Sequence, residues 1–543
     1  MKAKLFIILS AVTLCCAGCV SQDNTLGESL IPVNHIYRVV SPDPVEIPVR
    51  MEVADSLSAY SSTRITIGAI RNDSEFGVST RSSCLTLVPL FVDSLDFGTN
   101  PVPLEFHFSA SVDSTSVSDR MEQNIIQNVF VYELSEALDE SKTYCRSLPE
   151  HSSDVITTNL PIITPGDSLS FDFNLDFAKK YLDIKSEDLK DLSAYTKRFP
   201  GICITTGKPV GQGGRFNIFN LQLAYDSDYG YLMGNMAKLR FNSTWEEDGV
   251  PVQKDSSFYF YFSPTDFFDI DSLLTNSGTG SFPQYCANLT KDASSAYVGD
   301  ATDYVYVEGG AGVKPVVSAE FLRRSAIERI SANGHDPSKA VINKASLTFH
   351  YVAPDPLFET MYKVPEILSP TCRIKGEEAV SFMGLTDASD SNEDQGSRHL
   401  AQMTYSPDIT YHLQTLLGLK DDNEQLLNGS YDVWLLIMHN DVVTTTTSGN
   451  SELSEYYNYL AYQSYMGDMY GGYGYGYGSY GYGYNNYYNY SMMAQMYGSS
   501  TTTSSVSVNL DRDRYYYCRL YGPEASDASL RPTFSFTYSI PGE

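Results

Sequence analysis

Short segments in which apolar and polar residues alternate constrain this fold more than any other feature of the sequence. Residues 104–108 read Leu-Glu-Phe-His-Phe, and residues 170–173 read Ser-Phe-Asp-Phe. A period of two turns alternate side chains to opposite faces of a strand, one toward a core and one toward solvent. Turn residues separate many such segments at intervals common in sandwiches and jelly rolls. The sequence therefore predicts a mostly β protein.

Helical patterns are few, and they connect strands rather than build a layer of their own. A length of 543 residues suits two to four units, at roughly 150 residues per unit. The composition changes between residues 225 and 250, which predicts a boundary there. We expect two β-sandwich or jelly-roll-like units, residues 35–230 and 231–543, with connecting helices at about 176–189, 318–330 and 408–417.

Residues 456–498 differ from the rest of the chain. They hold sixteen of its 41 tyrosines, many of them alternating with glycine. Glycine loses so much backbone freedom on folding that we expect a disordered insert within the C-terminal unit. Tyrosine faces could nevertheless stack on sugars or on other tyrosine-rich segments, which is the alternative interpretation.

The N-terminus predicts export and a lipid anchor. Lys2 and Lys4 precede about ten apolar residues, too few to span a bilayer, as in a signal peptide. The sequence Cys-Ala-Gly-Cys at 16–19 resembles a bacterial lipobox. It predicts cleavage after Gly18, lipidation of Cys19 with diacylglycerol and palmitate, and a tether over residues 19–34. The alternative is an ordinary secretory signal with an incidental cysteine.

The charge balance excludes one large class of partners. The chain carries 37 basic and 66 acidic residues, a formal net charge of −29. Non-specific nucleic-acid binding needs clustered cations that contact phosphates, so we expect no nucleic-acid partner. We expect lipid chains rather than basic patches to hold the protein at a membrane.

Six cysteines remain beyond the signal region, widely spaced and without a Cys-x-x-Cys motif: Cys84, Cys145, Cys203, Cys286, Cys372 and Cys518. Outside the reducing cytoplasm they could form three disulfides in any of about 15 pairings. Several lie in apolar strand-like runs, where buried free thiols are equally reasonable. Spacing alone leaves the pairing open.

Motifs of established chemistry are missing from the sequence. The glycine cluster at 207–215 lacks the spacing of a phosphate-binding loop. The acidic run at 387–396 resembles a calcium loop from Asp390, but position 12 is Ala401 instead of Glu. The histidines, including His107 and His350, form no metal-binding pair along the chain. We expect no catalytic residue, no metal and no cofactor, although a carboxylate pair formed only in space stays open.

A series of short motifs follows in order along residues 23–540: residues 26–32 (LGESLIP), 67–70 with Asp73 and 76–77, 128–134, 199–204, 307–313 (VEGGAGV), 341–347 and 531–539. Together they resemble a family of Bacteroidota outer-membrane lipoproteins known as domain of unknown function 4270. The insert at 456–498 is not part of that pattern. The resemblance implies an outer-membrane lipoprotein without established enzymatic residues, and only the lipid-bearing Cys19 is carried over.

One recurrent tripeptide, Asp-Ser followed by Leu or Thr, is similar to the O-glycosylation acceptor of exported Bacteroidota proteins. It marks candidate acceptors at Ser56, Ser94, Ser114, Ser168 and Ser272. Several such matches arise by chance in an acidic, serine-rich chain, which is the alternative interpretation.

These features predict a non-catalytic lipoprotein of the cell outer membrane, on its extracellular face, that serves an envelope complex as an accessory or binding component. A position facing the periplasm stays open as an alternative, because residues 20–24 after Cys19 supply a single acid. The resemblance implies an outer-membrane β-barrel complex as partner. The alternative is a carbohydrate-binding module or adhesin subunit, for which Trp245 is the candidate exposed indole because Trp434 lies in a core-like run. A hydrolase with a site formed only in space is a third hypothesis.

Overall fold

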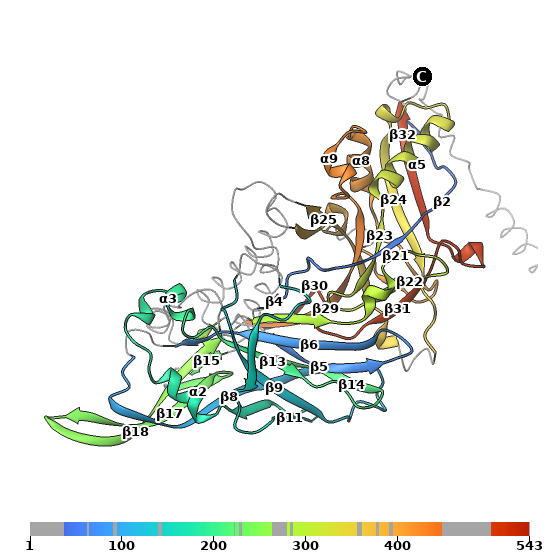
Figure 1. Cartoon of the computed structure of the whole chain (residues 1–543). Coiled ribbons are helices and arrows are strands. Elements are labelled where there is room, and N and C mark those ends of the chain that lie inside the picture. Colours follow the sequence, from blue (N-terminus) through green and yellow to red (C-terminus); the bar gives the residue numbers. More distant parts are fainter. Residues whose placement is uncertain are drawn as a thin grey trace, which may run out of the picture.

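The computed structural model of the chain confirms a mostly β protein (Figure 1): of the residues that it describes, 49% form strands and 15% form helices. It describes residues 37–541, except 62–63, 91–94, 140–143, 165, 222, 227–230, 263–279, 283–285, 356–360, 376–379, 390–394 and 448–500. The expected signal peptide, lipid anchor and tether, and the Tyr/Gly-rich insert at 456–498, lie outside the described residues. None of the described helices is both long and apolar enough to cross a membrane.

The N-terminal unit is a 14-stranded antiparallel sheet that folds back on itself. Its last strand, β7, begins two residues after the end of β6, so the chain connects this end of the sheet directly to a strand in its interior. The main path runs β10 (His151–Val155), β9 (Gln127–Leu134), β13 (Ile202–Thr206), β6 (Gly77–Leu85), β5 (Arg64–Asn72), β14 (Gly213–Asn220), β8 (Thr99–Val117), β17 (Ala237–Glu247), β18 (Val250–Phe262) and β7 (Leu87–Pro89). Beside it lie β11 (Ile162–Ile163), β12 (Leu169–Asp172), β20 (Cys286–Lys291) and β4 (Tyr60–Ser61).

Aromatic side chains from alternate strand positions fill the N-terminal unit. Phe106 and Phe108 on β8 are fully buried. The ring of Phe108 stacks on that of its cross-strand neighbour Phe171, with centroids 4.7 Å apart. The period of two in the sequence is thus confirmed here: the phenylalanines face the core, and the residues between them face outward.

The sheet continues across the boundary expected between residues 230 and 231. Strand β17 pairs with β8 along most of its length, and β18 pairs with β17. Leu239 and Phe260 from these two strands are fully buried in the same core as Phe106. Strands β17 and β18 therefore belong to the N-terminal unit, because their inward side chains complete its core. A small sheet flanks this hairpin in sequence: β15 (Leu223–Asp226) and β16 (Tyr231–Gly234) precede β17, and β19 (Gly280–Phe282) follows β18.

The C-terminal unit consists of two larger sheets and a short ribbon. One sheet runs β21 (Gly299–Asp300), β3 (Arg50–Val53), β23 (Val313–Val317), β29 (Val433–Thr447), β25 (Ile367–Lys375) and β26 (Val380–Gly384), with β30 (Thr501–Leu510) beside β29. The other runs β1 (Tyr37–Val40), β32 (Thr533–Pro541), β24 (Val341–His350), β28 (Thr404–Tyr405) and β27 (Arg398–His399), with β2 (Val45–Glu46) beside β32. The ribbon pairs β22 (Tyr304–Glu308) with β31 (Tyr517–Tyr521). Strands β1 to β3 precede the N-terminal unit in sequence but join this later unit.

Two of the three expected helices form as predicted. Helix α5 (Ala319–Ala332) begins after Ser318, whose side chain accepts the amide hydrogen of Phe321. Helix α8 (Thr410–Gly418) packs against α5 and β24. The short helices α7 (Thr386–Ser389) and α9 (Glu424–Leu427) complete this unit.

The helix expected at 176–189 is shorter than predicted. Helix α2 (Leu175–Tyr181) ends at Tyr181. Helix α3 (Leu192–Thr196) begins only at Leu192, and the side chain of Asp191 caps its N-terminus. The segment between them holds a short 3-10 helix, η3 (Asp188–Lys190). Arg198, just after α3, donates hydrogen bonds to the backbone oxygen of Asp183 and to the carboxylate of Asp188 in this segment. These bonds fold the segment back as a loop, which the apolar periodicity did not indicate.

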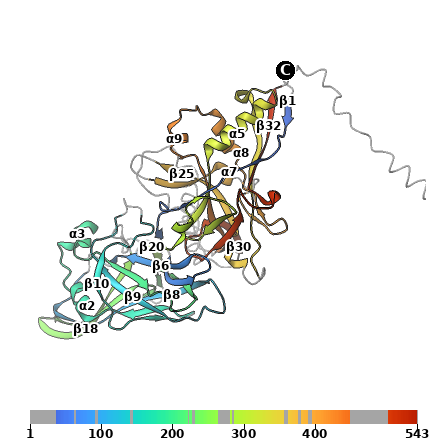
Figure 2. The ribbon, with the colours of Figure 1, turned by 45° about the vertical axis from the view of Figure 1, so that its right-hand side comes forward.

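The two units lie end to end in an elongated molecule (Figures 1 and 2). Strand β1, where the described chain begins, pairs with β32, where it ends, at the tip of the C-terminal unit. The hairpin of β17 and β18 projects at the opposite end, from the N-terminal unit. The described chain therefore begins and ends at the tip farthest from this hairpin.

Candidate functional site

The lipid-attachment residue Cys19 and the cleavage position Gly18 lie outside the described residues. So do residues 390–394 of the calcium-like run at 387–396. Asp387 at its start is buried and accepts the backbone amide hydrogens of Tyr411 and His412 at the beginning of α8. That carboxylate therefore serves as a helix cap.

The five candidate O-glycosylation serines differ in accessibility. Ser168 is exposed in the turn before β12, as a modified serine would need to be. Ser56 is half-buried, and its hydroxyl accepts a hydrogen bond of 2.9 Å from Arg373. Ser114 lies within strand β8. Ser94 and Ser272 lie outside the described residues.

The two tryptophans pack against apolar neighbours. Trp434 is 2% exposed, as its core-like run predicts. Trp245 is half-buried and packs against the core of the N-terminal unit, with the ammonium of Lys254 5.6 Å from the centre of its ring. Its indole is thus already engaged within the hairpin, so it is a poor candidate for an open sugar-stacking platform.

Side chains that face outward from β8 and β12 form a small group with metal-ligand and acid–base chemistry. The carboxylates of Glu105 and Asp172 and the imidazole of His107 each offer one atom, and these atoms lie within 4.8 Å of one another. His107 Nδ1 is 2.7 Å from Asp172 Oδ1, and His107 Nε2 is 3.2 Å from the Ser170 hydroxyl. We call Glu105, His107 and Asp172 the histidine–carboxylate cluster.

The strand register brings this cluster together. Asp172 is the direct cross-strand partner of His107, and Ser170 is the partner of Ser109, next in line on the same face. Arg240 on β17 faces Glu105 from the other side, and its guanidinium donates a 3.0 Å hydrogen bond to Glu105 Oε2. The same alternation that buries Phe106 and Phe108 turns these polar side chains outward.

The order Ser170–His107–Asp172 resembles the hydrogen-bond relay of hydrolases. However, the side chains stand on an open sheet face, where 52% of the Asp172 side chain is exposed. Water there competes with each hydrogen bond and screens the carboxylate, so the arrangement lacks the water-excluded setting in which such relays work. The same atoms suit metal binding, which tolerates water as an additional ligand.

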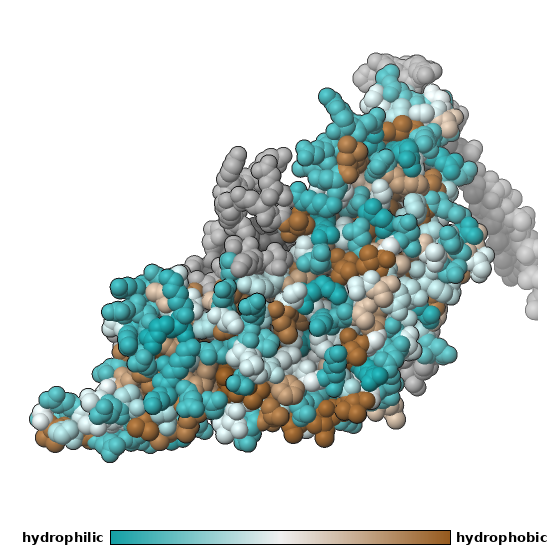
Figure 3. Space-filling model, in the orientation of Figure 1, coloured by the Kyte–Doolittle hydropathy of each residue, from teal (hydrophilic) through white to brown (hydrophobic). Residues whose placement is uncertain are grey.

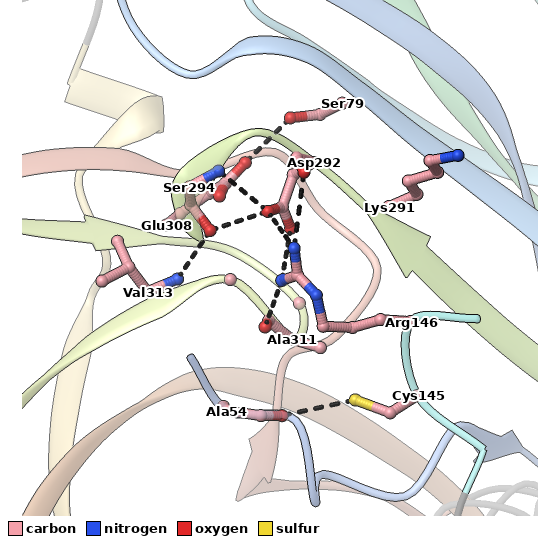
Figure 4. A network of polar contacts seen from close by, with 12 residues as sticks. Ala54, Ser79, Cys145, Arg146, Lys291, Asp292, Ser294, Glu308, Ala311 and Val313 are labelled. Carbon is pink, nitrogen blue, oxygen red and sulfur yellow. Dashed lines mark hydrogen bonds and ion pairs between the residues drawn. The ribbon is translucent and has the colours of Figure 1, made fainter. Parts of the chain in front are cut away.

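A second polar group lies at the junction between the two units and is buried (Figure 4). Arg146, from the loop after β9, makes two hydrogen bonds to the carboxylate of Asp292, at 2.8 and 3.1 Å. It donates a third, of 3.0 Å, to the backbone oxygen of Ala311 in the C-terminal unit. Asp292 also accepts hydrogen bonds from Ser294, whose hydroxyl in turn accepts the amide hydrogen of Val313. This network ties the loop between β22 and β23 to the N-terminal unit.

That loop, residues 309–312, is the junction loop, and its glycines let it approach closely. Gly310 adopts a φ of +59°, and a Cβ there would lie 2.7 Å from Thr290 Oγ1 and 2.9 Å from Arg81 Nη2. Lys314 Nζ stabilises the loop by donating hydrogen bonds to the backbone oxygens of Glu308, Gly310 and Gly312. A larger residue at 310 would clash with side chains of β6 and β20.

The junction also buries ionisable groups. Burial raises the pKa of the Glu308 carboxyl from 4.5 to about 8, although Ser79 donates a 2.8 Å hydrogen bond to it. Burial lowers the pKa of the Lys314 ammonium from 10.5 to about 8. The Arg81 guanidinium, 2% exposed, lies 4.3 Å from the centre of the Phe216 ring. These groups are structural, because none of them reaches solvent.

The raised pKa of Glu308 predicts how stability depends on pH. Between about pH 5 and pH 8, the folded protein keeps the Glu308 proton, whereas the unfolded chain has lost it. The folded state then binds more protons, so the free energy of unfolding falls as the pH rises through this window. Lys314 adds nothing there, since its two states differ only above about pH 8.

Glu308→Gln should therefore lose less stability than the wild type when the pH is raised from 5 to 8. Urea unfolding of both proteins at pH 5, 6.5 and 8 measures this difference. If the free energy of unfolding changed equally with pH in the two proteins, Glu308 would be ionised in the folded state at pH 7.

An open cleft of about 200 Å³ lies at the start of α5. Asp432 accepts the amide hydrogen of Ala319 there and a 2.8 Å hydrogen bond from Arg50. Lys375 donates to the backbone oxygen of Asn428 at its rim. Arg50 lies 3.1 Å from the carboxylate of Glu52 and 2.8 Å from that of Asp432, so these charges already pair within the fold.

All six described cysteines are buried free thiols. Cys84 and Cys203 are direct cross-strand partners on β6 and β13, and Ala287 flanks Cys84 on the other side. Burial raises the pKa of Cys145 to about 12, so this thiol is a poor nucleophile. Of the two interpretations left open by spacing, the structure favours free thiols.

Sequence reasoning missed both polar groups. His107 and Asp172 are 65 residues apart, and no spacing rule joins them. The junction loop was recognised only as a motif, residues 307–313, that resembles the lipoprotein family. That resemblance remains a prediction about this chain. Comparison of the chain with models of protein families, with curated proteins and with solved structures finds no match.

Proposed function

We propose that this protein is a non-catalytic lipoprotein of the outer membrane, anchored through Cys19 and displayed on the cell surface, where it acts as an accessory or binding component of an envelope complex. The observation that carries this proposal is the place where the chain enters the elongated fold. The described chain begins in β1 at one tip, and the N-terminal unit forms the opposite end (Figures 1 and 2). An anchor that joins β1 would leave the N-terminal unit projecting away from the membrane.

The length of chain before the fold agrees with this arrangement. Seventeen residues separate Cys19 from Tyr37. A fully extended segment of that length spans at most roughly 60 Å, which is enough to hold the fold at or above a lipid surface. Because the tether joins the C-terminal unit, that unit would lie nearest the membrane.

The projecting N-terminal unit offers exposed apolar side chains of the kind that proteins use for recognition. Ile126, Leu160 and Ile162 are 68%, 49% and 58% exposed. Ile162 lies on β11, which pairs with the first two residues of β9, and Ile126 directly precedes β9. Figure 3 shows apolar side chains along this lower edge of the N-terminal unit. Exposed apolar clusters of this kind mark interaction surfaces more often than isolated residues do.

The complex can be tested by extraction of outer membranes in mild detergent. We expect the protein to migrate with a β-barrel partner, well above its own mass of 60.3 kDa.

The lipid anchor can be tested separately. Cys19→Ser should leave an unprocessed or soluble precursor that no longer labels with palmitate, because the atom that carries the lipid is gone. Migration as a lone species would contradict the complex, and normal palmitate labelling of the variant would contradict the anchor.

A carbohydrate-binding or adhesin role is the second candidate, and one observation favours it. The rings of Phe130, Tyr132 and His151 stack in a row on the outward face of β9 and β10, with interplanar angles of 13° and 20°. All three are half-buried, so part of each ring faces solvent. Aromatic rows of this kind can stack on sugars. Specific retention on a polysaccharide column, together with lone migration in detergent, would promote this role over the complex.

A further inference from the structure

We propose that the histidine–carboxylate cluster, Glu105, His107 and Asp172, binds a divalent transition-metal ion of the zinc class. One imidazole nitrogen and two carboxylate oxygens lie within 4.8 Å of one another. Two ligand atoms bound to the same zinc ion, each at about 2.0–2.2 Å, lie less than about 4.4 Å apart. Small rotations of these partly exposed side chains are enough to bring all three atoms onto one ion.

The backbone holds the three ligands in place without help from loops. Glu105 and His107 are two residues apart on β8 and so face the same side of the sheet. Asp172 faces them from β12 as the cross-strand partner of His107. Sites carried on paired strands keep their geometry better than sites on loops.

The chemistry of the ligands selects the metal. An imidazole nitrogen is a good ligand for zinc, copper and nickel, whereas calcium and magnesium prefer oxygen ligands alone. Zinc sites with three protein ligands keep a fourth position for water or for a ligand from outside. Because the sheet face is open, this fourth position would face solvent, where a carboxylate of a partner or a small molecule could bind.

Neighbouring polar groups fit the outer shell of such a site. When His107 binds the ion through Nδ1, its Nε2 carries the proton and donates to the Ser170 hydroxyl, 3.2 Å away. Metal-binding histidines usually donate their second ring nitrogen to such an acceptor. Arg240, in contrast, donates a 3.0 Å hydrogen bond to Glu105 Oε2 and so competes with a metal ion for that carboxylate.

The nearby cations should weaken metal binding. Lys238 is the cross-strand partner of His107 on the side opposite Asp172, and Arg240 bonds to Glu105. Their positive charges oppose a divalent cation on the same face. Arg240→Gln should therefore tighten metal binding, which a site held together only by ion pairs and hydrogen bonds would not predict.

Titration of zinc into the purified full chain, in the presence of a competing chelator, tests the proposal. We expect one zinc ion per chain, at least tenfold weaker binding in His107→Ala and Asp172→Asn, and tighter binding in Arg240→Gln. Cobalt(II) in place of zinc should give a visible absorption band that His107→Ala abolishes.

Two control variants separate this site from general surface binding. His151→Ala removes a partly exposed histidine outside the cluster, and Asp255→Asn removes an exposed carboxylate from the same sheet face, where it accepts a hydrogen bond from Asn242. Both should bind zinc as the wild type does, and all variants should keep the wild-type melting temperature without metal. Equal zinc binding by the wild type and His107→Ala would overturn the proposal, as would equal losses in the control variants.

Discussion

Gly310→Ala is expected to destabilise the protein by roughly 2 to 5 kcal/mol. About 1 to 2 kcal/mol comes from placing a side chain on a backbone with φ of +59°. The rest comes from overpacking, typically about 1 to 3 kcal/mol, because the new Cβ would lie within 3 Å of Thr290 and Arg81. Neither neighbour can move easily, since Arg81 and Thr290 are both buried. Chemical unfolding measures the loss.

Gly334→Ala is the matched control for the junction loop. Gly334 follows helix α5 with φ of +81°, and no atom lies within 4 Å of the position that a Cβ would take. This variant should lose only the backbone penalty, about 1 to 2 kcal/mol. Equal losses at 310 and 334 would mean that the junction loop does not fit tightly against the N-terminal unit.

Arg146→Met is expected to cost about 3 to 5 kcal/mol, the usual result when one partner of a buried ion pair is removed. The Asp292 side chain is fully buried, and Arg146 supplies two of its hydrogen bonds (Figure 4). Without the guanidinium, the carboxylate keeps only its bonds from Ser294. Arg146→Lys should recover part of the loss, since an ammonium restores the charge but not the paired geometry.

Arg71→Met is the matched control for this ion pair. Arg71 lies 3.0 Å from Asp73, and the two side chains are 39% and 48% exposed. Exposed pairs contribute about 0 to 1 kcal/mol, so this variant should unfold almost as the wild type does. A loss at position 146 no larger than at position 71 would show that the Asp292 carboxylate is hydrated.

The strands were predictable because local pattern determines them. The run Leu-Glu-Phe-His-Phe at 104–108 alternates, and in the structure Phe106 and Phe108 face the core while His107 faces outward. Helix α5 was predictable for a similar reason, because Ser318 caps it. Periodicity and capping act within a few residues, so one sequence is enough to find them.

The assignment of strands to units was not predictable in the same way. Strands β17 and β18 follow a change in composition, yet β17 pairs with β8 and β18 pairs with β7, both from much earlier in the chain. Strand β3 precedes the N-terminal unit and pairs with β23 of the C-terminal unit. Such pairings depend on which apolar faces meet in space, and composition carries little information about them.

The candidate sites were the least predictable part. His107 looked like an ordinary strand histidine until Asp172, 65 residues later, paired opposite it. Asp292 and Arg146 are likewise joined only by the fold. Acidic residues are too numerous in this chain for any single one to stand out, so only register and burial identify those with a specific role.

Site-specific photocross-linking on intact cells tests the central claim, that the N-terminal unit is the recognition end of a lipid-anchored molecule. Photoreactive residues at Val250 and Ile162, both 58% exposed on the N-terminal unit, should capture a protein partner. The same group at Arg38 or Val341, exposed near the tip that carries β1, should capture lipid or nothing. Capture of the partner only from positions 38 and 341, with none from 162 and 250, would contradict the account.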